Sequence, residues 1–322
     1  MSCKPISVLG IAIVLAILVI AGCDKNTPPT NIISVGILKH SSAIPIIVAQ
    51  REHFFENRGL KVSLHPLTPS QHMPALLHGD VQILSPSSFP VIFSTAQQNP
   101  EKIIAYMTGG EATNGDILYG LVVPKDSTMS SLSDLLGKTI GSASKFTIVN
   151  LRNVLGSKLG DVKGNTKIRE ISDRSALLNA LQQGAIDAAV LDQPALSSRE
   201  VSEHFKVIEP NFRAKYMGNN PYWSGSGIAN KNWVHNNKKD FEAYLAALDD
   251  ALAFCKRDPL KAKSDFVEHF AIKGLQPEAI GMYVYPSSHF APPHEFVQAL
   301  ANSLITNGML STGFNFTDLF YQ

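Results

Sequence analysis

Two stretches of the sequence decide the fold, Ala75-Leu-Leu-His-Gly-Asp-Val-Gln-Ile-Leu-Ser-Pro-Ser-Ser88 and Ala180-Leu-Gln-Gln-Gly-Ala-Ile-Asp-Ala-Ala-Val-Leu-Asp-Gln-Pro194. Both begin with the pattern A-L-x-x-G-x-[VI] and end in polar residues with a proline. In each stretch we expect the end of a helix, a glycine that caps it in the left-handed conformation, and a buried strand. The two stretches therefore predict equivalent helix-strand units, although a chance match between two unrelated units would produce the same pattern.

Strand and helix patterns alternate along the chain around both stretches. The spacing of apolar residues predicts strands at 32–38, 61–67, 81–84, 138–141, 167–171 and 186–191. Helices are expected at 43–57, at 70–78 with Ser70 as N-cap, at 131–136 and 147–159, from Ser172 or Asp173 to Gly184, and at 240–256, 260–271 and 293–306. This alternation favours an α/β protein in which each sheet is mixed, mostly parallel and flanked by helices.

The polar strand ends indicate where a ligand would bind. Open α/β sheets bind ligands beside the carboxyl ends of their strands. The first quoted strand ends in Ser87 and Ser88, and the second ends in Asp192. If the two units lie in two lobes that face each other, these side chains line one cleft.

The N-terminal residues have the pattern of an export signal. An apolar run at 6–20 follows Lys4 and leads into Ala21-Gly22-Cys23. The run is shorter than the roughly 20 residues of a membrane-spanning helix, although an uncleaved anchor is an alternative. Small residues before a cysteine resemble the lipobox of bacterial lipoproteins. This resemblance implies that residues 1–22 are a signal peptide, that Cys23 is acylated, for example with palmitate, and that residues 23–31 form a polar tether.

Charge and cysteine content exclude several classes of protein. The chain has 28 Lys and Arg against 27 Asp and Glu, so its net charge is +1 and no broad basic surface for nucleic acid is expected. Of the three cysteines, Cys3 lies in the signal and Cys23 is assigned to the lipid. Cys255 then has no disulfide partner in the mature chain, and the helical pattern around it predicts a buried thiol.

Several short motifs occur in a fixed order along the chain. They are Val35-Gly36-Ile37, the V-A-Q helix from Ile44 to Gln50, Phe54-Phe55-Glu56-Asn57-Arg58-Gly59-Leu60-Lys61-Val62, and Leu77-His78-Gly79-Asp80-Val81. This order resembles the SsuA/THI5-like, NMT1-like family of ABC transporter solute-binding proteins, whose members bind nitrate, sulfonates, taurine or thiamine precursors. Later family signatures match 132–140, 184–188 and 226–233, whereas Gln82 stands where the family commonly has an acid.

The resemblance implies a two-lobe, type II periplasmic-binding-protein-like fold. Residues 32–120 and 225–322 would form lobe 1 and residues 121–224 lobe 2, with two chain crossings as the hinge. It also implies a monomeric, lipid-anchored protein on the extracytoplasmic face of the membrane, periplasmic or at the cell surface. This protein would close around a small organic anion, zwitterion or heterocycle and deliver it to an ABC permease. A binding protein that feeds a sensory receptor is an alternative.

Candidate ligand contacts in lobe 1 follow the first and third expected strands. His40, Ser41 and Ser42 lie in the loop before a helix, where hydroxyls and helical amides hold anionic or polar groups. The alternative is that these serines only cap the helix. Ser87 and Ser88 have the same position after the third strand.

Candidate contacts in lobe 2 combine a helix start, a cation and a carboxylate. Ser144 and Lys145 follow a strand and open a helix. Asp192 would lie opposite Ser87 and suggests an amine or N–H on the ligand, although it could instead cap the helix after it. Trp223 lies near the second crossing, where the family commonly has aromatic cleft walls, and core packing is its alternative.

Signatures of catalysis and metal binding are missing from the sequence. It contains neither G-x-S-x-G nor H-E-x-x-H. His289 and His294 bracket a proline turn without a carboxylate or cysteine at ligand spacing. We therefore expect no enzyme activity, no catalytic residue, no cofactor and no metal. The alternative is an enzyme on the same fold, because pyrimidine-precursor synthases and some menaquinone-pathway enzymes resemble this family; the cysteine-rich motif of the synthases is absent here.

Overall fold

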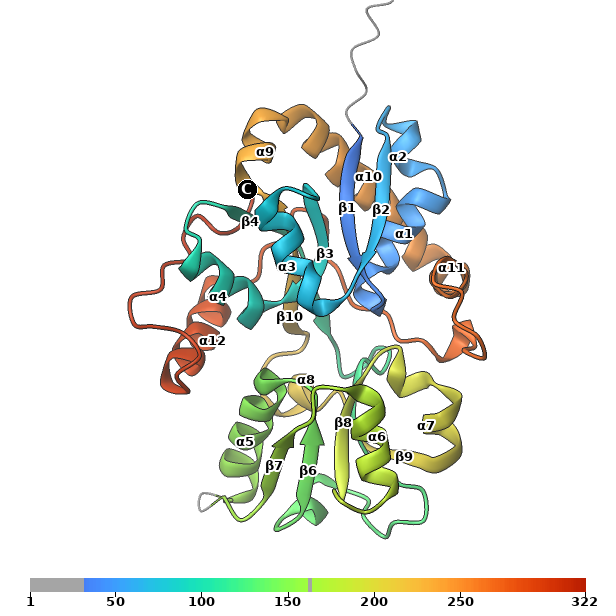
Figure 1. The fold of residues 1–322 in the computed structure, drawn as a ribbon, viewed down its shortest axis with the longest axis vertical. Helices are drawn as coiled ribbons and strands as arrows, with labels where there is room; N and C mark the ends of the chain where they lie inside the picture. Colours follow the sequence, from blue (N-terminus) through green and yellow to red (C-terminus); the bar gives the residue numbers. More distant parts are fainter. Residues whose placement is uncertain (1–31, 162–163) are drawn as a thin grey trace, which may run out of the picture. The chain divides into compact units, whose positions relative to one another are not determined.

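The computed structural model describes residues 32–161 and 164–322. The expected signal at 1–22, the lipidation residue Cys23 and the tether at 23–31 lie outside the described residues. The described chain forms two five-stranded sheets, each with its own helices (Figure 1). The predicted α/β, two-lobe fold class is confirmed.

The first sheet has the strand order β2-β1-β3-β10-β4. Its strand β1 pairs in parallel with β2 and β3, whereas β10 is antiparallel to both β3 and β4. The bounds are β1 Ile33–Leu38, β2 Val62–Leu67, β3 Ile83–Ser88, β4 Ile103–Glu111 and β10 Tyr222–Asn230. Four strands of this sheet therefore run in one direction and β10 runs in the other, which agrees with the expected mixed, mostly parallel sheet.

The second sheet repeats this arrangement in the order β7-β6-β8-β5-β9. Here β6 is parallel to β7 and β8, and β5 is the antiparallel strand between β8 and β9. The bounds are β5 Tyr119–Pro124, β6 Thr139–Ser142, β7 Lys167–Glu170, β8 Ala188–Asp192 and β9 Phe205–Pro210. The antiparallel strands β5 and β10 are the strands by which the chain enters the second sheet and returns to the first.

Helices cover both sheets. Those around the first sheet are η1 Ser41–Ala43, α1 Ile44–Arg51, α2 Phe54–Asn57, α3 Pro69–His78, α4 Phe89–Gln98, α9 Lys231–Asn236, α10 Lys238–Arg257, α11 Pro259–His269, η4 Pro277–Ala279 and α12 His294–Thr306. Those of the second lobe are η2 Leu132–Leu135, α5 Lys145–Leu159, α6 Arg174–Gln182, η3 Ala195–Ser197, α7 Arg199–His204 and α8 Phe212–Tyr216. None of the described helices is long and apolar enough to cross a membrane.

Buried side chains alternate between the two faces of each sheet, as the pleat of a strand requires. In β3, Ile83 packs into one core with α1 and α10, and Leu84 packs into another with α4 and α12. In β8, Val190 and Leu191 likewise enter different cores of the second lobe. Each sheet is therefore covered on both faces, and only its edges and the ends of its strands are left open to other contacts.

The quoted glycines have the predicted conformation. Gly79 ends α3 with φ 87°, and Gly184 follows α6 with φ 70°. The strand after Gly79 is longer than the predicted 81–84, because Ser87 and Ser88 pair with Ser226 and Gly225 of β10. The polar tip of the stretch is therefore part of the sheet.

Two local predictions were wrong. The expected helix at 43–57 is two helices, since α1 ends at Arg51 and α2 begins at Phe54 after His53 with φ 61°. The N-cap of α3 is Thr68 and not Ser70, because Gln71 closes a capping box with Thr68 around the proline at the first helical position. The sequence left either Ser172 or Asp173 as the N-cap of α6, and in the structure it is Asp173.

The chain passes between the sheets at 112–118 and 211–221. The expected lobe limits at Gly120 and Gly225 fall inside β5 and β10. We propose that the hinge lies in these two connecting segments, so that the lobe limits lie a few residues before each of the expected ones.

Candidate ligand-binding site

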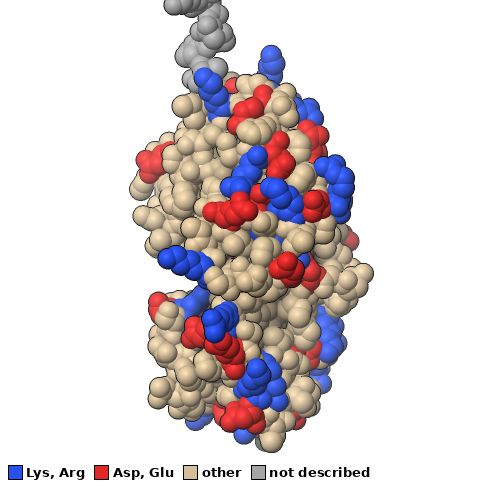
Figure 2. All heavy atoms as spheres, turned by 90° about the vertical axis from the view of Figure 1, so that its right-hand side faces the viewer, with Lys and Arg blue, Asp and Glu red and all other residues tan. Residues whose placement is uncertain are grey.

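A cavity of about 690 Å³ is lined from both sheets. Lys39 and His40 reach it from the end of β1, Ser87 and Ser88 from the end of β3, and Asp192 from the end of β8. Ser142, the last residue of β6, completes the second side together with Ala143, Ser144, Phe146 and Thr147. The cavity therefore lies at the carboxyl ends of the parallel strands, as expected for open α/β sheets. Figure 2 shows Lys and Arg side chains on both sides of a notch in the molecular surface.

Most of the predicted site residues come together here. His40, Ser87, Ser88, Ser144 and Asp192 all line the 690 Å³ cavity. Ser42 and His40 line a small inner recess that shares several residues with this cavity. Ser87 and Asp192, the tips of the two quoted stretches, therefore face one space.

Three predicted residues have other positions. Ser41 lines a different cavity in lobe 1, and Trp223 is buried against Phe290 with ring centroids 4.6 Å apart. Neither is among the residues that line the 690 Å³ cavity. Lys145 is the first residue of α5, but its side chain lies outside those that the structure describes.

Asp192 is compensated by an arginine of its own lobe. Its carboxylate forms an ion pair with Arg174, and its Oδ2 lies 3.8 Å from His40 Nε2 across the cavity. Burial lowers the pKa of His40 to about 4, against the opposite effect of Asp192. His40 is therefore neutral at pH 7, and its Nδ1 lies 2.9 Å from the Ser42 hydroxyl. The sequence suggested that Asp192 binds a ligand amine. Because Arg174 already compensates its charge, Asp192 attracts such an amine less strongly than expected.

A buried ion pair joins the two lobes at the inner end of the cavity. Arg213 of α8 is 2% exposed and Glu111 at the end of β4 is 0% exposed, with 2.8 Å from Nε to Oε1. The guanidinium also lies 3.6 Å from the centre of the Tyr119 ring. Against the effect of burial, Glu111 raises the pKa of Arg213 well above its ordinary value. Arg213 therefore keeps its charge and presents it to the cavity that it lines.

Further basic side chains surround the opening. Lys39, Arg199 and Lys273 line the cavity together with Arg174 and Arg213, whereas Asp192 is its one acidic lining residue among those described. Lys39 and Lys273 have no carboxylate within ion-pair distance in the described part of the chain, and Arg199 pairs with Glu203. The N-terminus of α5 adds partial positive charge, since Ser144 caps it by accepting from Thr147 N. The field in the cavity therefore favours an anion.

Apolar side chains form the rest of the wall. They come from β2, α3, α4, α5, α6 and the segment after α11, and include Leu67, Met73, Val91, Phe146, Leu177 and Leu275. His72 of α3 lies among them, 2% exposed, with Nε2 3.4 Å from Ser85 Oγ. Burial lowers the pKa of His72 to about 4, so this side chain adds no charge at neutral pH.

Side-chain hydrogen bonds fasten the two crossings. The Asn211 amide donates to Ala112 O and Asp116 O at 2.9 Å each, and its Oδ1 accepts from Leu118 N at 2.8 Å. The backbone N–H of Thr113 donates to Asn220 Oδ1, and the side-chain amide of Asn220 donates to the Thr113 hydroxyl. These bonds hold the first crossing against the second.

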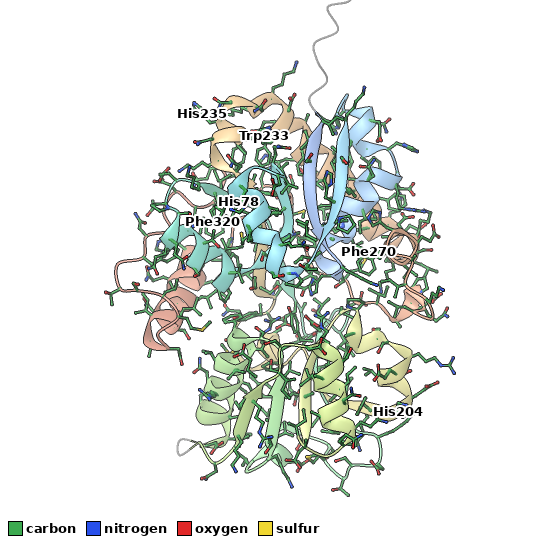
Figure 3. All side chains as sticks on the ribbon, in the orientation of Figure 1. His78, His204, Trp233, His235, Phe270 and Phe320 are labelled. Carbon is green, nitrogen blue, oxygen red and sulfur yellow. The ribbon has the colours of Figure 1, made fainter. Side chains whose placement is uncertain are left out.

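The histidines are dispersed. His78, His204 and His235 are exposed and lie on separate elements (Figure 3). His289 Nε2 lies 3.2 Å from Glu242 Oε2, and His294 packs against the Phe316 ring. No group of three or more His, Cys, Asp and Glu side chains in 32–161 and 164–322 is placed to hold a metal ion.

Sequence reasoning missed Arg174, Arg199, Arg213 and Lys273. Arg174 is the first residue of α6 and lies four residues after the end of β7, so the rule that ligands bind beside strand ends could have included it. Arg213 follows β9, a strand that the apolar spacing did not predict. Lys273 lies after α11, far along the chain from the other lining residues, and had no local signal.

Several solved structures of binding proteins are similar to this one. The periplasmic aliphatic sulphonate binding protein SsuA of Escherichia coli is 15% identical, with a TM-score of 0.69 over 90% of this chain and 92% of that chain. A ligand-binding component of an ABC-type import system from Staphylococcus aureus is 12% identical, with a TM-score of 0.69 over 90% and 96%. The nitrate-binding protein NrtA of Synechocystis PCC 6803 is 12% identical, with a TM-score of 0.63 over 89% and 84%. At these identities the likeness shows the fold.

The sequence comparisons place the chain more narrowly. No curated protein sequence matches it significantly. A family model described as NMT1/THI5 like matches residues 40–262, which include both quoted stretches and most of the residues that line the cavity. The protein therefore belongs to the NMT1/THI5-like family, as its motifs predicted.

Proposed function

We propose that this protein is the solute-binding component of an ABC importer and captures a small organic anion between its two lobes. The observation that carries the proposal is the cavity at the facing strand ends, where five basic side chains and one acidic side chain line the wall. The fold relatives named for sulphonate and nitrate binding support the same class of ligand. Sulfonates, including the zwitterion taurine, and the inorganic anion nitrate are the candidates.

The arrangement of charges favours an anion over an amine. Arg174 already compensates Asp192, so a ligand cation would have to compete with a guanidinium. Arg213 uses Nε and Nη2 for Glu111, which leaves Nη1 for an acceptor in the cavity that it lines. Hydrogen bonds between a charged donor and an anion are the stronger kind, and burial at the inner end increases their effect. Arg213 and the amides of α5 would therefore hold the anionic group, and Ser87 and Ser88 would bond its remaining oxygens.

Closure of the lobes would make the complex recognisable to a permease. Ligand contacts from both sheets bias the hinge toward one relative orientation, because only the closed state offers all of them at once. The Tyr283 hydroxyl donates to the Tyr119 hydroxyl at 3.2 Å, and His40 approaches Asp192, so the lobes also contact each other directly. A permease that binds only this orientation would receive the loaded protein. This step rests on the fold relatives that are ligand-binding components of import systems.

The N-terminal residues would keep the protein at the membrane. The run at 6–20 and the lipobox-like residues before Cys23 support an exported lipoprotein. The Cys23→Ser variant should move the protein from the membrane fraction to the soluble extracytoplasmic fraction, as an immunoblot of fractionated cells would show. Continued retention in the membrane would favour an uncleaved anchor.

Calorimetric titration of the full-length protein in detergent tests the binding role. The panel contains ethanesulfonate, taurine, nitrate, bicarbonate and an uncharged pyrimidine, and we expect at least one anion to bind while the uncharged member does not. Lys39→Gln should weaken that binding about 2- to 5-fold, as the loss of a partly exposed charge does. Lys167→Gln, which removes an exposed charge from β7 outside the cavity, is the matched control and should leave the affinity unchanged.

Two results would contradict the proposal. If no anion binds to the folded protein, or if the uncharged pyrimidine binds and Lys39→Gln has no effect, the cavity does not select for negative charge. Consumption of a panel member with release of a product would favour the alternative of an enzyme on the same fold.

A further inference from the structure

Lobe 1 contains a second cavity, of about 210 Å³. It shares no lining residue with the 690 Å³ cavity. Its walls are η1, the start of α1, the end of α10, the start of α11 and the segment 282–285. The second cavity shares Tyr283 and Tyr285 with the inner recess, but every residue that lines it differs from those of the proposed anion site.

A polar group without a partner lines the second cavity. Ser41 is 1% exposed, and its Oγ has no hydrogen-bond partner among the described residues. Its neighbour Ser42, by contrast, bonds His40 and Pro86 O. A buried hydroxyl without a partner destabilises a fold by about 1–3 kcal/mol, so such groups commonly serve a ligand or another function. Ser41 Oγ both donates and accepts, and it therefore suits a ligand hydroxyl.

The remaining wall favours an uncharged aromatic ring. Ile44, Pro45 and Leu252 supply an apolar surface. Cys255 and Met282 place two sulfur atoms in the wall, and sulfur makes favourable contacts with aromatic rings. Burial raises the pKa of the Cys255 thiol to about 12, so the thiol is uncharged and the inner wall has no ionised group. Lys256 is exposed and belongs to the rim.

The volume of the second cavity further restricts which ligands fit. A cavity of about 150 Å³ lined by Leu, Ile and Phe binds benzene. The 210 Å³ here leaves room for one ring and a small substituent, but not for two fused rings with side chains. We propose that the second cavity binds an uncharged molecule with one aromatic ring and one hydroxyl group, and that Ser41 is its hydrogen-bond partner.

Methyl NMR of the full-length protein labelled at its methionine methyl groups tests this proposal. The chain has seven methionines; Met282 lines the second cavity and Met73 lines the 690 Å³ cavity, so each cavity has its own reporter. The Met282→Leu and Met73→Leu variants assign the two signals. Titration with phenol should shift the Met282 signal through the ring current and leave the Met73 signal in place.

The Ser41→Ala variant separates hydrogen bonding from cavity filling. It should weaken phenol binding about 3- to 10-fold, as the loss of one hydrogen bond does, and leave the affinity for fluorobenzene unchanged. Circular dichroism establishes that the variant is folded. A shift of Met73 alone, no shift of Met282 at millimolar phenol, or equal phenol affinity with and without the Ser41 hydroxyl would each overturn the proposal.

Discussion

The Arg213→Met variant should lose about 3–5 kcal/mol of unfolding free energy at pH 7, because it leaves the buried Glu111 carboxyl without the cation that compensates its charge. Methionine fills a similar space, so the lost charge and not a cavity would cause the effect. Urea unfolding followed by circular dichroism measures the loss. Anion binding should be lost as well, since the cation at the inner end of the cavity is gone.

The pH dependence of this loss identifies Glu111 as its cause. Burial raises the pKa of Glu111 even though Arg213 acts in the opposite direction. Without Arg213 that pKa rises further, so the folded variant binds a proton that the unfolded chain releases above its ordinary carboxyl pKa of about 4.3. A raised folded-state pKa contributes stability below the unfolded value and loses it as pH rises. The difference in unfolding free energy between the wild type and the variant should therefore be smallest near pH 4 and grow toward pH 7.

A double variant provides the control for this prediction. Glu111→Gln combined with Arg213→Met removes both charges, and it should recover most of the stability that the single variant loses. A single variant within about 1 kcal/mol of the wild type, or a double variant no more stable than the single one, would show that the pair is not a buried, mutually compensating one.

The Gly225→Ala variant should lose about 3 kcal/mol of unfolding free energy, at the upper end of the range for overpacking. A Cβ at this position would lie 2.0 Å from Ser87 O and 2.7 Å from Ser87 C. Both are backbone atoms, so no side-chain rotation can relieve the contact, and β10 must move away from the end of β3. Because Gly225 pairs with Ser88, this movement displaces two of the cavity serines, and anion affinity should fall with stability.

Gly156→Ala is the matched control for this substitution. Gly156 lies within α5, and a Cβ there would meet nothing within 4 Å. Alanine in a helix interior is favoured over glycine by roughly 0.5–1 kcal/mol, so this variant should be more stable than the wild type. If both alanine variants change stability to the same extent, the close approach of β3 and β10 does not limit the residue at position 225.

Local sequence patterns were sufficient for most of the helices and for the parallel strands. Gly79 and Gly184 ended their helices as predicted, because a left-handed residue is a local requirement. The strands β4, β5, β9 and β10 were not predicted, although Ile103–Glu111 and Tyr222–Asn230 are the longest of all. Both are rich in glycine, serine or threonine, and pairing with neighbouring strands, not their own composition, makes them strands.

The residues of the candidate site also fall into two groups, those that local sequence patterns could predict and those that they could not. Serines and Asp192 at strand ends were predictable, since a strand carries its own tip to the sheet edge. The pair of Arg213 and Glu111 joins residues 102 positions apart, and no local pattern relates them. Ser41 and Ser42 are adjacent in sequence, yet Ser41 lines the 210 Å³ cavity and Ser42 lines the inner recess beside the 690 Å³ cavity. The tertiary arrangement, and not the residue type, therefore decides which polar residue contacts a ligand.

We propose that the strand ends of both sheets hold one ligand together. Amide hydrogen exchange, measured with and without the tightest-binding anion of the calorimetric panel, tests it most directly. The structure predicts slower exchange at Ser87 and Ser88 of lobe 1 and at residues 144–147 and Asp192 of lobe 2, all in the same experiment. Protection confined to one lobe, or protection elsewhere with these two edges unchanged, would contradict it.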